Sequence, residues 1–320
     1  MLCRPLDYRG LSLLRKTMQL ITGDCRSVLA ALPKQSVHCC VTSPPYFGLR
    51  DYGHDGQIGL EQTPDAYVAE LVAVFREVHR VLRDDGTLWL NLGDSYNAYN
   101  ANRGASASIS DGTAGRDHPK HRQGLTTSTL KNKDLIGIPW RVAFALQADG
   151  WYLRQDIIWH KPNPMPESVR DRCTKAHEYL FLLSKGPRYY FDSEAMKEPA
   201  VKGAAGSSFN KGKTAKHQLG RSSDKDRVGS ETRNRRSVWS VTTKPFKGAH
   251  FATFPPDLIE PCVLAGCPDG GTVMDPFNGA GTTGIVALSN RRNYIGIELN
   301  PGYTELTRTR FKQAGFDTTC

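Results

Sequence analysis

Short apolar segments alternate with amphipathic helical segments along most of this 320-residue chain, and this alternation restricts the fold more than any other feature. The segment from Thr63 to Leu82 places apolar residues three and four positions apart, which indicates a helix. Such alternation predicts an α/β protein with a mainly parallel sheet covered on both faces. Seven segments are expected to be strands, beginning near Met18, Val37, Thr87, Leu153, Glu178, Thr272 and Tyr294.

The cysteines and the apolar runs exclude several classes of protein. Eight cysteines occur without any CxxC pair, so we expect free thiols, a reducing cytoplasm and no metal site. Cys39 and Cys40 are neighbours on an expected strand and should point to opposite faces. His118–His121 (HPKH) is more typical of a solvated loop than of a metal site. No apolar run is long enough to cross a membrane, and residues 1–17 are expected to be an extension rather than a signal peptide.

The excess positive charge is concentrated in one segment. The chain has a net charge of +10, and the stretch Lys197–Lys247 holds thirteen basic residues against four acidic ones. Clustered lysine and arginine are typical of a surface that binds phosphates, so this segment predicts contact with nucleic acid. The alternative is a soluble basic loop without a partner.

The stretch VMDPFNGAGTTGIVA, Val273–Ala287, has the order strand, glycine turn, helix. Gly279, Gly281 and Gly284 match G-x-G-x-x-G, a pattern that offers backbone N–H groups to a ligand. The match alone is weak, because such turns also serve only to pack a helix on a sheet.

Two acidic residues sharpen this interpretation. Glu298 ends the next expected strand, where a carboxylate can accept the hydroxyls of a ribose. Asp275 precedes the glycines, where it would repel a pyrophosphate and attract the ammonium of a methionine moiety. The pair favours S-adenosyl-L-methionine over a nicotinamide dinucleotide.

A second loop, Ser43–Tyr46 (SPPY), follows an apolar strand. Pro44 and Pro45 stiffen the loop and lack N–H groups, so their carbonyls are expected to be free to accept. Together with the Ser43 hydroxyl they suit an N–H₂ group, and Tyr46 could stack on the ring that carries it. A nucleobase amine meets these demands if the base is flipped out of the duplex. The alternative is a rigid turn with a buried tyrosine.

SPPY and DPFNGAGT in one chain resemble the amino-directed DNA methyltransferases, which modify N4 of cytosine or N6 of adenine. The order, with SPPY first, resembles the permuted β group of that family. The similarity extends from about Gln19 onward, through LITGD, WHKPNPMPESVRDRCTKAHEYLFLLS, HFATFP and RRNYIGIELNP.

The resemblance implies a Rossmann-like, circularly permuted methyltransferase fold with a seven-stranded sheet whose last strand is antiparallel. It divides the chain into a catalytic part at 18–192, a basic target-recognition insert at 193–249 and a cofactor-binding part at 250–320. Residues 95–133 are expected to be a long loop or lid, which could also touch DNA.

The resemblance also assigns roles to individual residues. For catalysis we expect Ser43, Pro44, Pro45 and Tyr46. For S-adenosyl-L-methionine we expect Asp24, His250, Phe254, Asp275, Phe277, Gly279, Gly281, Thr282, Thr283 and Glu298. For DNA we expect Lys161 and Asn163 from the resemblance, and Arg233, Arg235 and Arg236 from the charge of the basic segment.

The expected activity is direct methyl transfer from S-adenosyl-L-methionine to an amine of a flipped base in double-stranded DNA. Serine at position 43 favours N4 of cytosine over N6 of adenine, chiefly on the usage of the family that the chain resembles. A restriction endonuclease that recognises the same site is an expected partner. The same fold could methylate RNA or a protein glutamine, while a nicotinamide-dependent oxidoreductase or a non-enzymatic DNA-binding protein explains only part of the pattern.

Overall fold

The computed structural model describes residues 17–97, 120–121, 130–200, 231–243 and 254–316. Its centre is an eight-stranded sheet. The strands lie in the order β1 (Met18–Thr22), β12 (Asn293–Glu298), β11 (Thr272–Asp275), β2 (Val37–Thr42), β4 (Leu82–Leu92), β7 (His177–Ser184), β6 (Tyr152–His160) and β10 (Val238–Ser240).

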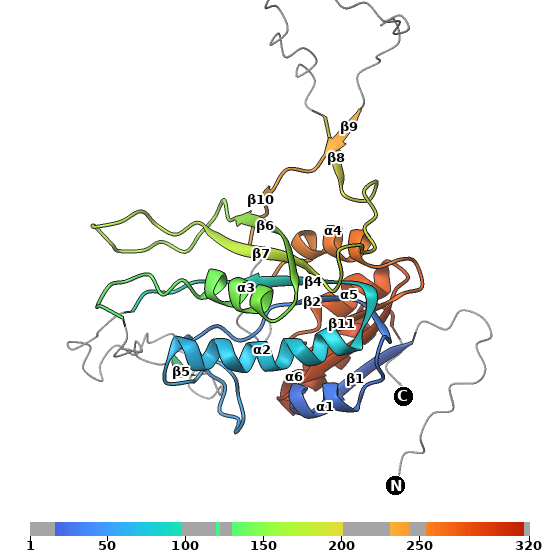
Figure 1. The fold of residues 1–320 in the computed structure, drawn as a ribbon, viewed down its shortest axis with the longest axis horizontal. Coiled ribbons are helices and arrows are strands. Elements are labelled where there is room, and N and C mark those ends of the chain that lie inside the picture. The colour runs from blue at the N-terminus through green and yellow to red at the C-terminus, as the bar shows by residue number, and fades with distance from the viewer. Residues whose placement is uncertain (1–16, 98–119, 122–129, 201–230, 244–253, 317–320) are drawn as a thin grey trace, which may run out of the picture.

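The seven expected strands are all present, and the α/β architecture is confirmed (Figure 1). The count of seven was wrong by one, because β10 comes from within the predicted insert and pairs in parallel with β6. Only β7 runs antiparallel to its neighbours in this sheet. It is the fifth expected strand along the chain, so the antiparallel strand is not the last one in the sequence.

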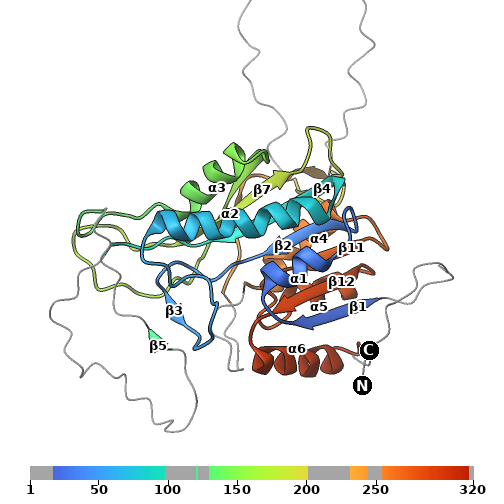
Figure 2. The ribbon, with the colours of Figure 1, turned by 60° about the horizontal axis from the view of Figure 1, so that its bottom comes forward.

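Helices cover both faces of the sheet (Figure 2). One core packs beneath α1 (Cys25–Ala31), α2 (Pro64–Val81) and α3 (Ile138–Ala148), and the other beneath α4 (Pro256–Gly266), α5 (Thr282–Ser289) and α6 (Pro301–Gln313). Cys40 lies in the first core and Cys39 in the second, as their alternation on β2 predicts. Short two-stranded ribbons join β3 (Arg50–Asp51) to β5 (Lys120–His121) and β8 (Lys197–Pro199) to β9 (Thr232–Asn234).

The helix bounds follow from local sequence. Thr63 caps α2 by accepting a hydrogen bond from the Ala66 amide at 3.1 Å, and Pro64 fills the first turn, where no intrahelical donor is needed. The face of α2 that includes Tyr67, Leu71 and Phe75 is fully buried. Among the described residues no helix is long and apolar enough to span a membrane, and no cluster of His, Cys, Asp and Glu could hold a metal ion.

Parallel pairing brings two distant loops together. Strand β11 lies beside β2, so the segments after Asp275 and after Thr42 leave the same edge of the sheet. The Thr42 hydroxyl donates to a carboxylate oxygen of Asp275 at 2.6 Å, across a separation of 233 residues. The topology thus places the proline loop and the glycine loop next to each other.

Candidate active site

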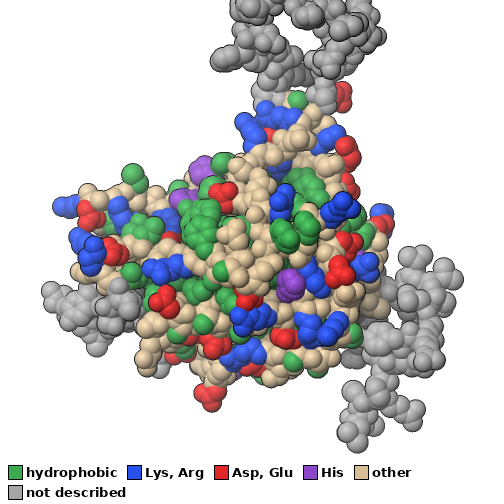
Figure 3. All heavy atoms as spheres, in the orientation of Figure 1, with side chains coloured by type: hydrophobic (Ala, Val, Ile, Leu, Met, Phe, Trp, Pro, Cys, Tyr) green, Lys and Arg blue, Asp and Glu red, His purple; other side chains and the backbone are tan. Residues whose placement is uncertain are grey.

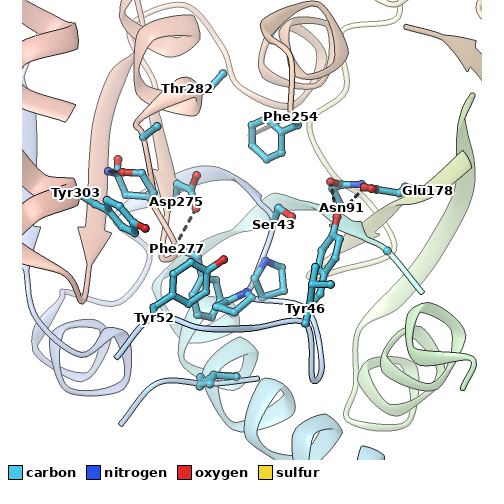
Figure 4. A pocket seen from close by; sticks show the side chains of 18 of the residues that line it. Ser43, Tyr46, Tyr52, Asn91, Glu178, Phe254, Asp275, Phe277, Thr282 and Tyr303 are labelled. Atoms are coloured by element: carbon cyan, nitrogen blue, oxygen red, sulfur yellow. Dashed lines mark hydrogen bonds between the residues drawn. The ribbon is translucent and has the colours of Figure 1, made fainter. Parts of the chain in front are cut away.

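A cavity of about 1070 Å³ opens at the carboxyl ends of the parallel strands. This is the edge where ligands bind in open α/β sheets. Strand β7 runs the other way, so its first residues, rather than its last, reach the same edge. Figure 4 shows Ser43 in the space between Asp275 and Phe277 on one side and the group of Tyr46, Asn91 and Glu178 on the other.

Most of the predicted site residues line this cavity. They are Asp24, Ser43, Pro44, Pro45, Tyr46, Lys161, Asn163, Phe254, Asp275, Phe277, Gly279, Thr282 and Glu298. His250 falls outside the described residues. Gly281, Thr283 and the three arginines of the insert are not among the lining residues.

The glycine turn needs its glycines for conformation and for close packing. Gly281 precedes α5 with a φ of 74°, a left-handed value that favours glycine. A Cβ atom there would lie 2.5 Å from the Thr307 side chain. Gly281 therefore shapes the turn from behind, while Gly279 and Thr282 face the cavity.

Asp275 is a buried carboxylate with three donors. It accepts from the hydroxyls of Thr42 and Thr283, at 2.6 and 2.8 Å, and from the Phe277 amide at 3.0 Å. Burial nevertheless outweighs these bonds and raises the pKa of Asp275 from 3.8 to about 6. Thr283 thus acts through Asp275, from a fully buried position.

Glu298 closes the same end of the cavity. Its two oxygens accept from the backbone amides of Gly279 and Asn300 at 2.7 and 2.9 Å. Burial raises the pKa of Glu298 to about 7, above its ordinary 4.5. Each oxygen retains a second lone pair, so this carboxylate can accept further hydrogen bonds from a ligand.

Asp24 lines the cavity but is already strongly engaged. Its side chain accepts from the Arg26 backbone amide at 2.9 Å, and its carboxylate pairs with the Arg26 guanidinium at 2.6 Å. These bonds to Arg26 lower the pKa of Asp24. The same guanidinium reaches Glu70 and the Gly56 carbonyl, at 3.0 Å each, and so connects α1, α2 and the loop that contains Gly56.

The proline loop differs from expectation at one carbonyl. The Pro45 carbonyl is not free, because it accepts from the hydroxyl of buried Tyr67 at 2.7 Å. That bond fixes the loop against α2. Ser43 is half-buried and lies at the centre of the cavity (Figure 4).

Tyr46 is held by its hydroxyl rather than left to rotate. It donates to Glu178 at 2.6 Å and lies 3.2 Å from the Asn91 side-chain oxygen, and the Asn91 amide in turn donates to Glu178 at 3.2 Å. Burial and the Glu178 charge raise the pKa of Tyr46, so the hydroxyl stays protonated. A Cβ atom on Gly93 would lie 2.5 Å from the Tyr46 ring, so only glycine allows this close approach.

The two predicted DNA contacts beside the cavity have partners within the protein. The ammonium of Lys161 pairs with Glu178 and lies 4.3 Å from the centre of the Trp159 ring. The side chain of Asn163 exchanges two hydrogen bonds with the backbone of Thr243, at 3.2 and 3.0 Å.

The insert arginines lie on β9 and on the approach to β10. Arg233 and Arg236 share the carboxylate of Glu198, at 2.8 and 3.1 Å, while Arg235 lies 5.0 Å from the centre of the Trp239 ring. Figure 3 shows lysine and arginine side chains gathered at the end of the molecule that carries β8 and β9. Most of the other basic residues of the segment fall outside the described ranges.

Several cavity residues were missed by sequence reasoning. Three of them, Asn91, Gly93 and Glu178, surround Tyr46. The rings of Tyr52 and Tyr303 pack edge to face beside the glycine loop, with their centres 6.2 Å apart. The position of Glu178 at the start of an expected strand could have identified it. If that strand is antiparallel, its first residues lie at the edge of the sheet where the neighbouring parallel strands end. No comparable signal marked Tyr52, which lies in an irregular segment.

Comparison with known proteins gives consistent matches. The model of the DNA methylase family N6_N4_Mtase matches residues 37–309. The chain is 49% identical over 311 residues to the Type II methyltransferase M.Cfr9I of Citrobacter freundii, covering 96% of this chain and 90% of the relative.

Solved structures share the fold at lower identity. The cytosine-N4-specific PvuII DNA methyltransferase matches with a TM-score of 0.62 and 18% identity, over 95% of this chain and 89% of that one. The S-adenosyl-L-methionine complex of TTHA0409 from Thermus thermophilus, named as a DNA modification methylase, matches with a TM-score of 0.58 and 24% identity, over 95% and 100%.

Proposed function

Because the chain belongs to the N6_N4_Mtase family of DNA methylases, we propose that it transfers a methyl group from S-adenosyl-L-methionine to N4 of cytosine in double-stranded DNA. The observation that carries the proposal is the meeting of the SPPY loop and the DPFNGAG loop in one cavity. One loop suits an amine acceptor and the other suits a cationic methyl donor.

The residues of the glycine-loop side fit S-adenosyl-L-methionine. Asp275 and Glu298 are two buried carboxylates whose pKa values are raised by burial, so a cation beside them relieves an electrostatic cost. We assign the ammonium and sulfonium end to Asp275 and the ribose hydroxyls to Glu298. Three aromatic rings, those of Phe254, Phe277 and Tyr303, also line this part of the cavity. When bound, the cofactor supplies an electrophilic methyl group.

The chain's own contribution on the other side is to orient the amine. Ser43 accepts one N–H of the base, and the Pro44 carbonyl accepts the other. These bonds favour a pyramidal nitrogen whose lone pair is less delocalised into the ring. Tyr46 holds the plane of the base, since Glu178 fixes its hydroxyl at 2.6 Å. Placing the two reactants in line then accounts for much of the rate enhancement.

The cytosine assignment rests chiefly on family usage at position 43, with the small side chain of Ser43 as a lesser argument. A short hydroxyl leaves the shape of the pocket to the prolines and Tyr46, and the family usage noted above associates serine here with cytosine. The fold match to a cytosine-N4-specific enzyme is consistent with this choice. N6 of adenine is the alternative product.

The basic segment at 193–249 is the proposed DNA-recognition region. Its net positive charge supports this role. The relative from Citrobacter is named a Type II methyltransferase. We therefore propose a restriction endonuclease of the same sequence specificity as a functional partner in the cytoplasm.

The test is transfer of labelled methyl from S-adenosyl-L-methionine to duplex DNA, RNA and protein offered side by side. The proposal predicts label in duplex DNA alone. Label that appears only in RNA or protein would contradict it.

A further inference from the structure

The connection between β6 and β7 carries an apolar side chain that folding does not explain. Residues 161–176 leave the sheet as a long hairpin (Figure 1). Met165 on this hairpin is 86% exposed, more than any other large hydrophobic residue in the described ranges, and it lines the mouth of the cavity. Its neighbours Pro164 and Pro166 hold the backbone around it extended.

The root of the hairpin is fixed to the sheet. Asn163, two residues before Met165, is joined to the Thr243 backbone by two hydrogen bonds of 3.2 and 3.0 Å. Lys175, on the returning arm, donates to the Asp94 carbonyl at 3.1 Å. Both arms are therefore tied to segments that also line the cavity.

The outer part of the hairpin is braced as well. Arg172 pairs with Glu167 across the loop, and its guanidinium lies 3.9 Å from the centre of the Tyr96 ring. Asp171 pairs with Lys133 at 2.8 Å. Met165 is thus presented to solvent by a supported hairpin, which is an arrangement suited to insertion into a partner.

We propose that Met165 is a wedge that enters the duplex at the position vacated by the target base. The inference rests on the proposed function, because only a flipped base leaves such a gap beside the cavity mouth. Apolar side chains, methionine and proline among them, are used elsewhere to enter a base step and stabilise its opening. The hairpin carries four basic residues against two acidic ones, which suits an approach to phosphates.

The experiment compares Met165→Ala with wild type on two duplexes that contain the site methylated by the wild-type protein. In one duplex the target base is paired, and in the other it faces a mismatch. A mismatched base is already easier to flip. We expect the variant to lose roughly tenfold in kcat/KM on the paired duplex and less than about threefold on the mismatched one.

Two control variants separate insertion from other effects. Met165→Leu keeps an apolar wedge and should retain activity on both duplexes. Phe144→Ala shortens another exposed apolar residue, 55% exposed on α3 and outside the cavity lining, and should leave both rates unchanged. Calorimetry should give the same cofactor affinity for all of these proteins.

If Met165→Ala loses kcat/KM equally on paired and mismatched DNA, or on neither, the wedge is contradicted. The proposed function still stands in that case, provided that the wild-type protein is active. A wild-type protein that transfers methyl to neither duplex would contradict the proposed function and the wedge with it.

Discussion

Replacing Asp275 with asparagine is expected to stabilise the free protein while weakening cofactor binding. Burial raises the pKa of Asp275 from 3.8 to about 6, so the ionised carboxylate is unfavourable in the folded chain. At about 1.4 kcal/mol per pKa unit, ionisation lowers the free energy of unfolding by about 3 kcal/mol at pH 8. Asparagine avoids that cost.

The hydrogen bonds offset part of the gain. An asparagine oxygen can still accept from Thr42 and from the Phe277 amide, whose charge assistance the pKa of about 6 already includes, but the bond from the Thr283 hydroxyl is lost, at a cost of about 1 kcal/mol. The new N–H₂ group faces Thr283, whose hydroxyl can donate instead to the Val41 carbonyl, 3.3 Å away. The net expectation is a gain of about 2 kcal/mol at pH 8.

The gain must depend on pH with a defined sign. Because the folded-state pKa of Asp275 is raised, the protonated carboxyl contributes stability that is fully present below about pH 4. That stability is lost as the pH rises through about 6. The advantage of Asp275→Asn should therefore shrink to near zero at about pH 4.5. Urea unfolding of both proteins at the two pH values measures it, with Asp65→Asn, an exposed surface substitution, as the control.

Cofactor binding should change in the opposite direction. Loss of a charge-assisted contact corresponds to about 1.5–3 kcal/mol, or roughly 10- to 100-fold in affinity, which calorimetry at pH 8 detects. A variant that is equally destabilised at both pH values would refute the assigned cost of burial. Unchanged affinity would refute the proposed contact between Asp275 and the cationic end of the cofactor.

Two further predictions concern the base pocket and the DNA surface. Tyr46→Phe removes the hydroxyl that donates to Glu178, and should lower kcat about tenfold at unchanged cofactor affinity; an unaffected kcat would mean that this bond does not orient the ring. Neutralising Arg233, Arg235 and Arg236 together should reduce the slope of log affinity against log salt by roughly 0.9 per lost phosphate contact. An unchanged slope would mean that these three arginines do not contact DNA phosphates and that other residues bind the DNA.

The parts of the fold that depend on period and topology were predictable. Each expected strand exists, and the meeting of the two loops follows from the rule that parallel strands deliver their carboxyl ends to one edge. Cys39 and Cys40 are buried on opposite faces of the sheet because successive side chains of a strand point to opposite faces.

The parts that depend on tertiary pairing were not predictable. Strand β10 has only three residues, too few for a periodic signal, and it becomes a strand because Trp239 is buried beside β6. The tie between Tyr46 and Glu178 exists because β7 is inserted in reverse between β4 and β6. The Pro45 carbonyl is not free because the Tyr67 hydroxyl donates to it. The spacing of apolar residues in the helix predicted that Tyr67 is buried, but it could not predict the partner of its hydroxyl.

The central claim is methylation of an exocyclic amine, and the nature of the product tests it most directly. DNA treated with the purified protein and S-adenosyl-L-methionine is digested to nucleosides, and the methylated species is identified by mass spectrometry. The account predicts N4-methylcytosine. N6-methyladenine as the sole product would contradict the cytosine assignment, and 5-methylcytosine would contradict direct transfer to an amine altogether.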